Sequence, residues 1–242
     1  MAFNYSPKIV TNGLVLCLDA ANPKSYVSGS TKWNDLSKNY LNGTLTNGPT
    51  FNSANGGSIA FDGTNDSINN IGTVSSFPFI QNTGISTLSF WIKFNNTSNL
   101  EYITGNTPTS AEKGFYLGKN TNGSLQLLVF NGGGNPNGLV NYTSPIGLVN
   151  DTNWHNYTVT INKTINTNTI YKDGVLFSSG AGTGAWTLTS GNSTRTLVLA
   201  NINNHSFNFF NGNVANYLIY SSVLTAPEIL QNFNTTKTRF NL

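Results

Sequence analysis

Residues 154–177 read WHNYTVTINKTINTNTIYKDGVLF, and this stretch decides the fold. From His155 to Ile161, apolar or aromatic side chains alternate with polar ones, as in a strand with one face on a core and the other toward solvent. After a polar connection, residues 169–172 form a second predicted strand. It runs into Asp173-Gly174, a dipeptide that favours a tight turn because glycine tolerates positive φ. We predict an antiparallel hairpin whose final turn leads into a further strand.

The composition indicates a folded chain with a neutral surface. At 242 residues the chain is long enough for one β-sandwich with a sizeable core. Charged residues make up 9% of it, whereas roughly 25% is usual. Asn and Thr take their place, at about 70 residues together. With 38% hydrophobic residues the chain is not of the disordered type. We expect a single domain over residues 1–242, with its core at about 13–240.

The charge pattern argues against two classes of partner. The formal net charge is +3 and no run of Lys or Arg occurs, so neither nucleic acid nor an anionic membrane has a basic patch to bind. No stretch is apolar for long enough to cross a membrane. The first residues lack the basic-then-apolar order of a secretory signal, and we expect none. Cys17 is the only cysteine, so an internal disulfide is excluded and a buried thiol is expected.

Further strands are predicted by the same alternation along the chain. In residues 87–94, Leu88, Phe90 and Ile92 share one face, and Trp91 stands on the other. The polar connection over residues 19–47 is expected to be anchored by Trp33 and Leu36 and to turn at Asn42-Gly43. The remaining predicted strands cover residues 14–18, 57–62, 102–104, 115–117, 125–130, 197–200 and 214–220.

One helix is predicted, near the C-terminus. Thr225 and Glu228 have the spacing of a capping box, in which each side chain binds the backbone N–H of the other residue. Pro227 is tolerated in the first turn, where its missing donor has no partner to lose. Many short strands without alternating helices predict an all-β fold, an antiparallel two-sheet sandwich with one short C-terminal helix.

Four segments resemble the laminin-G-like domains of the concanavalin A-like jelly-roll superfamily. They are the hairpin WHxYxVT with IYxDG, the opening GLVLCLDAANPKSY with WxDLS and NGTL, the strand and turn SIAFDGTNDSI, and the closing GNVANYLIYSSVLTAPEI. They occur in the expected order over most of residues 13–240, and the resemblance implies a jelly roll. The opening and the Asn/Thr-rich composition are also similar to domains of structural proteins in tailed bacteriophages, particularly marine ones.

The sequence does not favour an enzyme. A glycan hydrolase needs two carboxylates across the scissile bond. None of the nine carboxylates lies in the E-x-D-x-x-E strand motif that hydrolases of this superfamily show. His155 and His205 lie far apart without a cysteine or serine arrangement that would indicate a triad, and no Cys/His cluster indicates zinc. His155 is interpreted as a packed structural residue.

Calcium is the one cofactor considered, because laminin-G-like domains often bind it in loops at one rim of the sandwich. Asp62, Asn65 and Asp66 in DGTND offer oxygen ligands of the kind that calcium prefers. The alternative, which we favour, is that the same residues simply make a β-turn.

Sugar binding normally needs an exposed aromatic ring with amides or carboxylates around it. The candidate stacking residues in or next to predicted loops are Tyr26, Tyr102, Tyr142 and Trp186. Most other aromatic residues are better explained as core packing. The excess of Asn and Thr suits hydrogen bonding to glycans, and equally suits solubility in a protein with little charge.

Two functions follow as hypotheses. The first is a non-enzymatic virion structural or decoration protein of a bacteriophage, carried on capsid or tail, for adhesion or weak binding of cell-surface glycans. Its partners would be virion proteins and further copies of itself, because virion proteins assemble as symmetric oligomers. The alternative is a calcium-dependent carbohydrate-binding module or lectin of a bacterial surface protein, located extracellularly.

Overall fold

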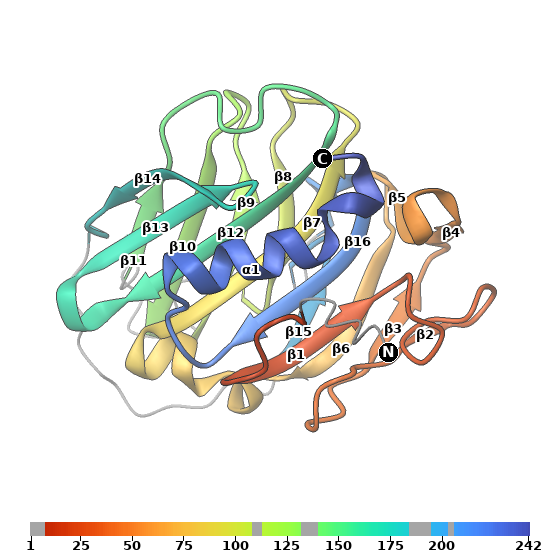
Figure 1. The fold of residues 1–242 in the computed structure, drawn as a ribbon, viewed down its shortest axis with the longest axis horizontal. Helices are drawn as coiled ribbons and strands as arrows, with labels where there is room; N and C mark the ends of the chain where they lie inside the picture. The colour runs from red at the N-terminus through yellow and green to blue at the C-terminus, as the bar shows by residue number, and fades with distance from the viewer. Residues whose placement is uncertain (1–7, 108–112, 132–139, 184–194, 203–205) are drawn as a thin grey trace, which may run out of the picture.

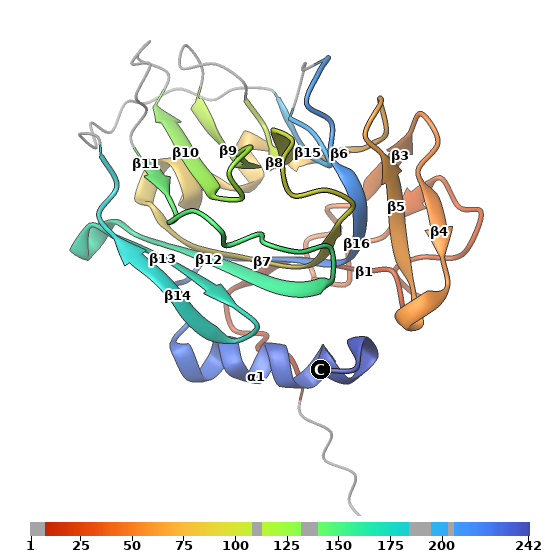
Figure 2. The same ribbon diagram turned by 90° about the horizontal axis from the view of Figure 1, so that it is seen from above.

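A computed structural model describes residues 8–107, 113–131, 140–183, 195–202 and 206–242. Two antiparallel sheets pack face to face, and a C-terminal helix lies against the outer face of one of them (Figures 1 and 2). The predicted class, an all-β antiparallel jelly-roll sandwich with one short C-terminal helix, is confirmed. Among the described helices, none is long and apolar enough to cross a membrane.

The sheet that carries the helix is called sheet A. Its central strand is β7, which pairs with β12 on one side and β16 on the other. From one edge to the other, sheet A consists of β14 (Val175–Gly180), β13 (Thr167–Lys172), β12 (Trp154–Asn162), β7 (Ile85–Phe94), β16 (Asn211–Tyr220), β5 (Ser58–Asp62) and β4 (Thr50–Asn52), with β1 (Leu14–Asp19) also paired to β16.

The opposite sheet is called sheet B, and it contains several strands that the sequence did not predict. From edge to edge it consists of β11 (Val140–Thr143), β10 (Leu125–Asn131), β9 (Lys113–Lys119), β8 (Glu101–Gly105), β15 (Thr196–Leu199), β6 (Ser67–Thr73), β3 (Gly43–Thr46) and β2 (Lys32–Trp33).

The predicted hairpin is present as β12 and β13. Asp173 and Gly174 both have positive φ, 53° and 76°, and their turn leads into β14, as expected. His155 fixes this turn, since its Nδ1 lies 2.6 Å from Asp173 Oδ2 and its Nε2 lies 3.1 Å from Asp151 Oδ1. The other oxygen of Asp173 accepts a hydrogen bond from the backbone N–H of Asn156. These contacts support the interpretation of His155 as a packed structural residue.

The core lies between the sheets. Phe90 of β7 stacks on Tyr217 of β16 with ring centroids 4.5 Å apart, and Phe94 meets Tyr157 of β12 edge to face. Phe90, Phe94 and Tyr157 belong to the faces that the alternation predicted, and all four side chains are 2% exposed or less. Trp33 is also fully buried here, so its predicted role as an anchor of the N-terminal connection is confirmed.

The outer face of sheet A is covered by helix α1 (Ala226–Thr236) and the following 3₁₀ turn (Lys237–Phe240). Trp91 projects toward them from β7, and it stacks on Phe240 at 4.0 Å and on Phe233 at 5.6 Å. Its Nε1–H donates to Thr236 Oγ1 at 2.6 Å. The helix is thus held over the sheet by aromatic contacts and one side-chain hydrogen bond.

The predicted capping box begins this helix. Thr225 Oγ1 accepts from Glu228 N–H, and Glu228 Oε2 accepts from Thr225 N–H at 2.8 Å. The two bonds satisfy backbone donors that a helix start leaves unpaired.

The predicted turn at Asn42-Gly43 is wrong. Gly43 is the first residue of β3, and a Cβ on it would lie 2.3 Å from a methyl group of Ile68 in β6. The glycine is needed for close packing of two strands rather than for a turn. The nearby chain reversal instead uses Tyr40, whose φ is 55°.

Cys17 is buried in β1, as expected. Burial, followed by the charges of Asp19 and Asp35, raises the pKa of its thiol to about 12. The thiolate, which is the reactive form, is therefore scarce at neutral pH.

The aromatic contact between helix and sheet gives a first prediction. Phe233→Ala removes a ring that is 8% exposed and stacked on Trp91, and should lower the free energy of unfolding by about 3 kcal/mol. Leu230→Ala in the same helix is the control, because Leu230 is 44% exposed and should cost about 1 kcal/mol or less. Urea denaturation followed by tryptophan fluorescence measures both. Equal losses for the two variants would contradict the assigned contact.

Candidate functional site

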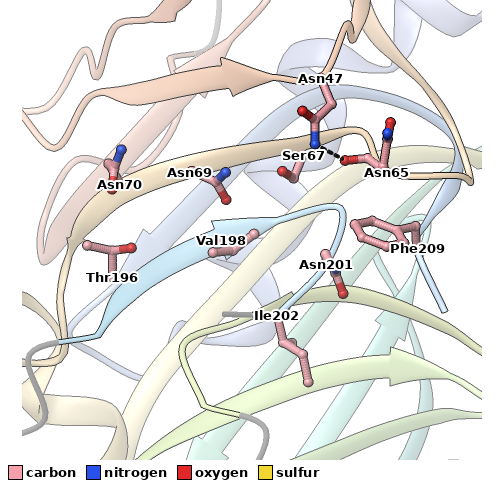
Figure 3. Close-up of a pocket in the computed structure, with 10 residues that line it drawn as sticks. All are labelled: Asn47, Asn65, Ser67, Asn69, Asn70, Thr196, Val198, Asn201, Ile202 and Phe209. Carbon is pink, nitrogen blue, oxygen red and sulfur yellow. Dashed lines mark hydrogen bonds between the residues drawn. The ribbon is translucent and has the colours of Figure 1, made fainter. Parts of the chain in front are cut away.

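A groove of about 350 Å³ is lined largely by residues of β6 and β15 that alternate with the core-facing ones, and so lies on the outer face of sheet B. Sheet B is on the side of the sandwich away from helix α1 (Figure 2). We call the groove the amide groove because half of its lining residues are asparagines. Figure 3 shows it extending along β6 and β15 from Asn70 and Thr196 toward Asn65 and Phe209. The residues that line it are Asn47, Asn65, Ser67, Asn69, Asn70, Thr196, Val198, Asn201, Ile202 and Phe209.

A bulge in β6 places two asparagines side by side in the groove. Asn70 has a φ of 63°, a left-handed conformation that asparagine adopts more readily than most residues. The register between β6 and β15 shifts at this point. As a result Ile68 and Ile71, three residues apart, both reach the core, and Asn69 and Asn70 both line the outer groove. An unbroken period of two would have sent one of the two amides inward.

The other strand of the groove follows ordinary alternation. Leu197 and Leu199 of β15 are fully buried in the core, and Thr196 and Val198 face the groove. At the far end, Asn47 Nδ2 donates to the backbone carbonyl of Asn65 at 3.0 Å, which ties two loops together beside the groove.

The chemistry of the groove is uncharged. Its five asparagine amides each carry two donors and an acceptor, and Ser67 and Thr196 add hydroxyls. None of the ten lining residues is ionisable. Phe209 adds a partly exposed aromatic ring at one end. Such a surface fits a neutral ligand with many hydroxyl groups and an apolar face.

Two of the four predicted stacking residues are buried, and for these the expectation of an exposed ring is wrong. Tyr26 is 5% exposed, stacks on Phe51 at 5.4 Å, and donates its hydroxyl to Ser30 O. Tyr142 is 6% exposed and donates to Ser178 Oγ. Both rings serve packing, with the hydroxyl bonded at the edge of the core.

The other two candidates have different outcomes. Tyr102 is half-buried and packs edge to face on Tyr116 at 5.3 Å. It forms an isolated parallel bridge with Phe209, so it lies beside the groove without lining it. Burial raises the pKa of its hydroxyl, which therefore stays protonated at neutral pH. Trp186 lies outside the described residues.

The three calcium candidates form the turn between β5 and β6. Asp62 Oδ1 accepts from Thr64 N–H at 2.7 Å, and Asp66 Oδ2 accepts from Asp62 N–H at 3.1 Å. Burial raises the pKa of Asp66, and the nearby charge of Asp62 raises it further. The hydrogen bond from Asp62 N–H acts in the opposite direction. Asn65 contributes its backbone carbonyl to Asn47. These contacts fit the β-turn that we favoured for the three residues.

As a calcium site this turn is incomplete. It brings together two carboxylates, each of which already accepts a backbone N–H. Within the described part of the chain, no group of three or more His, Cys, Asp or Glu residues is arranged to hold a metal. A further acidic ligand from another loop could come from Asp151 or Glu112. Asp151 is bonded to His155 instead, and Glu112 lies outside the described residues. Calcium binding stays a prediction.

The sequence analysis did not bring the residues of the groove together as a site, although it named Asn65 as a calcium candidate and placed Val198 in a predicted strand. Asn69 and Asn70 lie in a strand that was not predicted. Phe209 lies in residues 206–210, SFNFF, for which no element was predicted. One signal was present, since the pair of asparagines sits between two isoleucines spaced three apart, a pattern typical of a bulge.

Solved structures with this fold include one domain of an arabinanase and a toxin binding domain. Domain 4 of AbnA, an extracellular arabinanase of Geobacillus stearothermophilus solved with arabinotriose, has a TM-score of 0.62 and 14% identity, covering 90% of this chain and 97% of that one. The botulinum neurotoxin serotype D binding domain has a TM-score of 0.65 and 15% identity, covering 91% and 51%.

The Trypanosoma rangeli sialidase with sialic acid has a TM-score of 0.64 and 13% identity, covering 96% of this chain and 34% of that chain. This chain thus spans about a third of the sialidase and about half of the toxin domain. At these identities the similarity concerns the fold. A search of curated protein sequences gives no significant match.

A match between the amino-acid sequence and a family model supports the same fold without use of the structure. The model described as "Concanavalin A-like lectin/glucanases superfamily", a laminin-G-type family, matches residues 62–230, well over half of the chain. The matched segment holds β6, β15 and Phe209, and so most of the amide groove. The chain belongs to the concanavalin A-like lectin/glucanases superfamily.

Proposed function

We propose that this protein is a non-catalytic glycan-binding module that binds a neutral saccharide in the amide groove. The observation that carries the proposal is the groove itself, five asparagine amides and two hydroxyls beside the ring of Phe209, without an ionisable side chain in its lining. A pyranose or furanose presents hydroxyls that donate and accept, and a C–H face that packs on an aromatic ring. An uncharged groove neither attracts nor repels ions strongly, which favours neutral sugars over sialic or uronic acids.

Related structures support the proposal without deciding the ligand. A domain of similar size with this fold was solved with arabinotriose, and others are toxin binding domains. Hydrolysis of a glycosidic bond needs two carboxyl groups about 5–10 Å apart across the sugar. The lining of the groove contains none, which supports binding rather than catalysis.

Phe209→Ala tests the proposal directly. Loss of the ring should weaken binding of the best neutral ligand on a glycan array by about 30-fold, equivalent to about 2 kcal/mol. Phe207→Ala is the matched control, because Phe207 is 57% exposed and lies outside the lining of the groove. Isothermal titration measures both affinities. Equal affinity of Phe209→Ala and the native protein would exclude the groove as the binding site.

A calcium-dependent lectin is the version of this function in which the turn at Asp62 and Asp66 binds the ion. Without calcium, the raised pKa of Asp66 means that the folded protein holds this proton more tightly than the unfolded chain. Its contribution to stability is therefore present at low pH, and is lost as the pH rises above 3.8 through the raised value.

Asp66→Asn removes this titration but keeps a side-chain oxygen to accept the bond from Asp62 N–H. In chelator, its melting temperature should rise relative to that of the native protein as the pH rises above 3.8. Differential scanning calorimetry across pH measures the difference, and a difference independent of pH contradicts the assignment. A calcium site would show itself separately, since added calcium would then stabilise the native protein but not the variant.

We also propose that the module is displayed on a bacteriophage virion, on capsid or tail, as a homo-oligomer. The Asn/Thr-rich, weakly charged sequence and its N-terminal opening support this display, and a bacterial cell surface is the alternative location. The edge strand β14 offers a surface for self-association, since Val175 and Leu176 are 67% and 53% exposed.

Light scattering on the purified chain should give the mass of a defined oligomer. Val175→Lys, which places charge on the exposed edge strand, should shift the mass toward the monomer. Lys24→Glu is a control on the exposed N-terminal connection, away from the free edge of sheet A. A native protein that is monomeric at all concentrations would contradict self-association.

A further inference from the structure

A second pocket of about 330 Å³ lies at one end of the sandwich, next to the amide groove. We call it the rim pocket. It is formed where loops of both sheets meet, and Phe209 lines it as well as the groove. Its lining residues are Gly63, Ser98, Asn99, Leu100, Glu101, Thr121, Asn208, Phe209 and Asn211.

One residue of the rim pocket lining, Glu101, carries a buried carboxylate that is incompletely bonded. Glu101, the first residue of β8, is 1% exposed. Its Oε1 accepts from Asn96 Nδ2 at 2.6 Å. Its Oε2 is buried and accepts no hydrogen bond, although the backbone N–H of Asn211 is close enough to lower the pKa of the group. A buried acceptor without a partner in the chain is costly, so a donor from outside the chain, such as a water or a ligand hydroxyl, would stabilise it.

A buried lysine stands beside this carboxylate. Lys119 of β9 is opposite Glu101 in the ladder and is fully buried. Its Nζ donates to the carbonyl of Asn99 at 2.5 Å and lies 5.5 Å from the ring centre of Phe94. Burial raises the pKa of Glu101 and lowers that of Lys119, and in each case the charge of the other group opposes the shift. Both charged forms are thus poorly solvated by their surroundings.

We propose that the rim pocket is a second saccharide subsite, in which a sugar hydroxyl donates a hydrogen bond to Glu101 Oε2. This inference rests on the proposed glycan binding and extends it, because Phe209 lines both sites and lets one chain of sugar units occupy groove and pocket together. The ligand is then a neutral oligosaccharide rather than a single sugar.

The neighbouring lysine argues for a hydroxyl rather than a metal ion. The charge of Lys119 acts on Glu101 strongly enough to affect its pKa, and so would oppose a cation at the same oxygen. A hydroxyl is neutral and provides the single donor that Oε2 lacks. Asn99, Asn208 and Asn211 also line the pocket, and their side-chain amides are of the kind that binds further hydroxyls, although that of Asn211 already accepts from Asn95 Nδ2.

The probes for the test are the hexasaccharides and the matching monosaccharides of cellulose, starch, xylan and arabinan. Titration of the ¹⁵N-labelled protein should shift the amide signals of Asn69, Asn70 and Thr196 in the groove. A hexasaccharide should in addition shift those of Ser98, Asn99 and Thr121 at the rim.

Glu101→Gln should weaken hexasaccharide binding about tenfold or more. The glutamine oxygen keeps the bond from Asn96 Nδ2, so the amide nitrogen takes the place of Oε2 and cannot accept a hydrogen bond from a sugar hydroxyl. The variant should leave monosaccharide binding in the groove unchanged. Glu228→Gln makes the same change in the helix cap, outside both sites, and should bind as the native protein does. If Glu101→Gln does not fold, Ser98→Trp replaces it, since Ser98 is an exposed lining residue and a large ring there blocks the rim pocket.

The outcomes separate the two proposals. Shifts at both sites with the loss in Glu101→Gln support the second subsite. Shifts confined to the groove, with Glu101→Gln or Ser98→Trp equal to the native protein, overturn the subsite and leave the proposed function standing. Shifts confined to the rim support the subsite and overturn binding in the groove. No shift with any of these hexasaccharides or monosaccharides overturns both.

Discussion

The burial of Trp91 beneath the C-terminal helix is the constraint on which the arrangement of this protein depends. Strand alternation sends Phe90 and Ile92 into the core, so Trp91 must point away from it. A ring of this size is left in water only at considerable cost, and Phe233 and Phe240 cover it. With both faces of sheet A occupied, the outer face of sheet B is the broad surface on which a ligand can lie, and the amide groove is on it.

The sequence predicted the fold well where side chains alternate strictly. The hairpin of β12 and β13, the central strand β7 and the capped helix were predictable because each depends on local periodicity or on a local hydrogen bond. Strand β6 was not, because its bulge at Asn70 replaces the period of two by a spacing of three. The candidate site was mostly missed for the same reason. The burial of Tyr142 was equally hidden, since its partner Ser178 is 36 residues away in the sequence.

The many asparagines have a role that composition alone did not indicate. Asn216 Oδ1 accepts from the backbone N–H of Trp91 at a bulge in β16, and Asn156 Nδ2 donates to the carbonyl of Phe90. Among the described residues other than glycine, six of the nine with positive φ are asparagines. Besides lining the groove, asparagines therefore bind backbone groups beside a bulge and occupy positions with positive φ. The same residue type serves solubility, backbone geometry and ligand chemistry, so its abundance does not by itself identify a glycan-binding protein.

The two ends of the described chain lie on the same side of the molecule. Gln231 Nε2 of α1 donates to the carbonyl of Lys8, Val10 N–H donates to Asn232 Oδ1, and the chain ends beside the same helix. A carrier, bead or sensor surface joined to either end would therefore meet the helix-covered side of sheet A. Held in that way, the protein would turn its asparagine-lined face outward, and many copies side by side would form a layer whose grooves all face the surrounding medium.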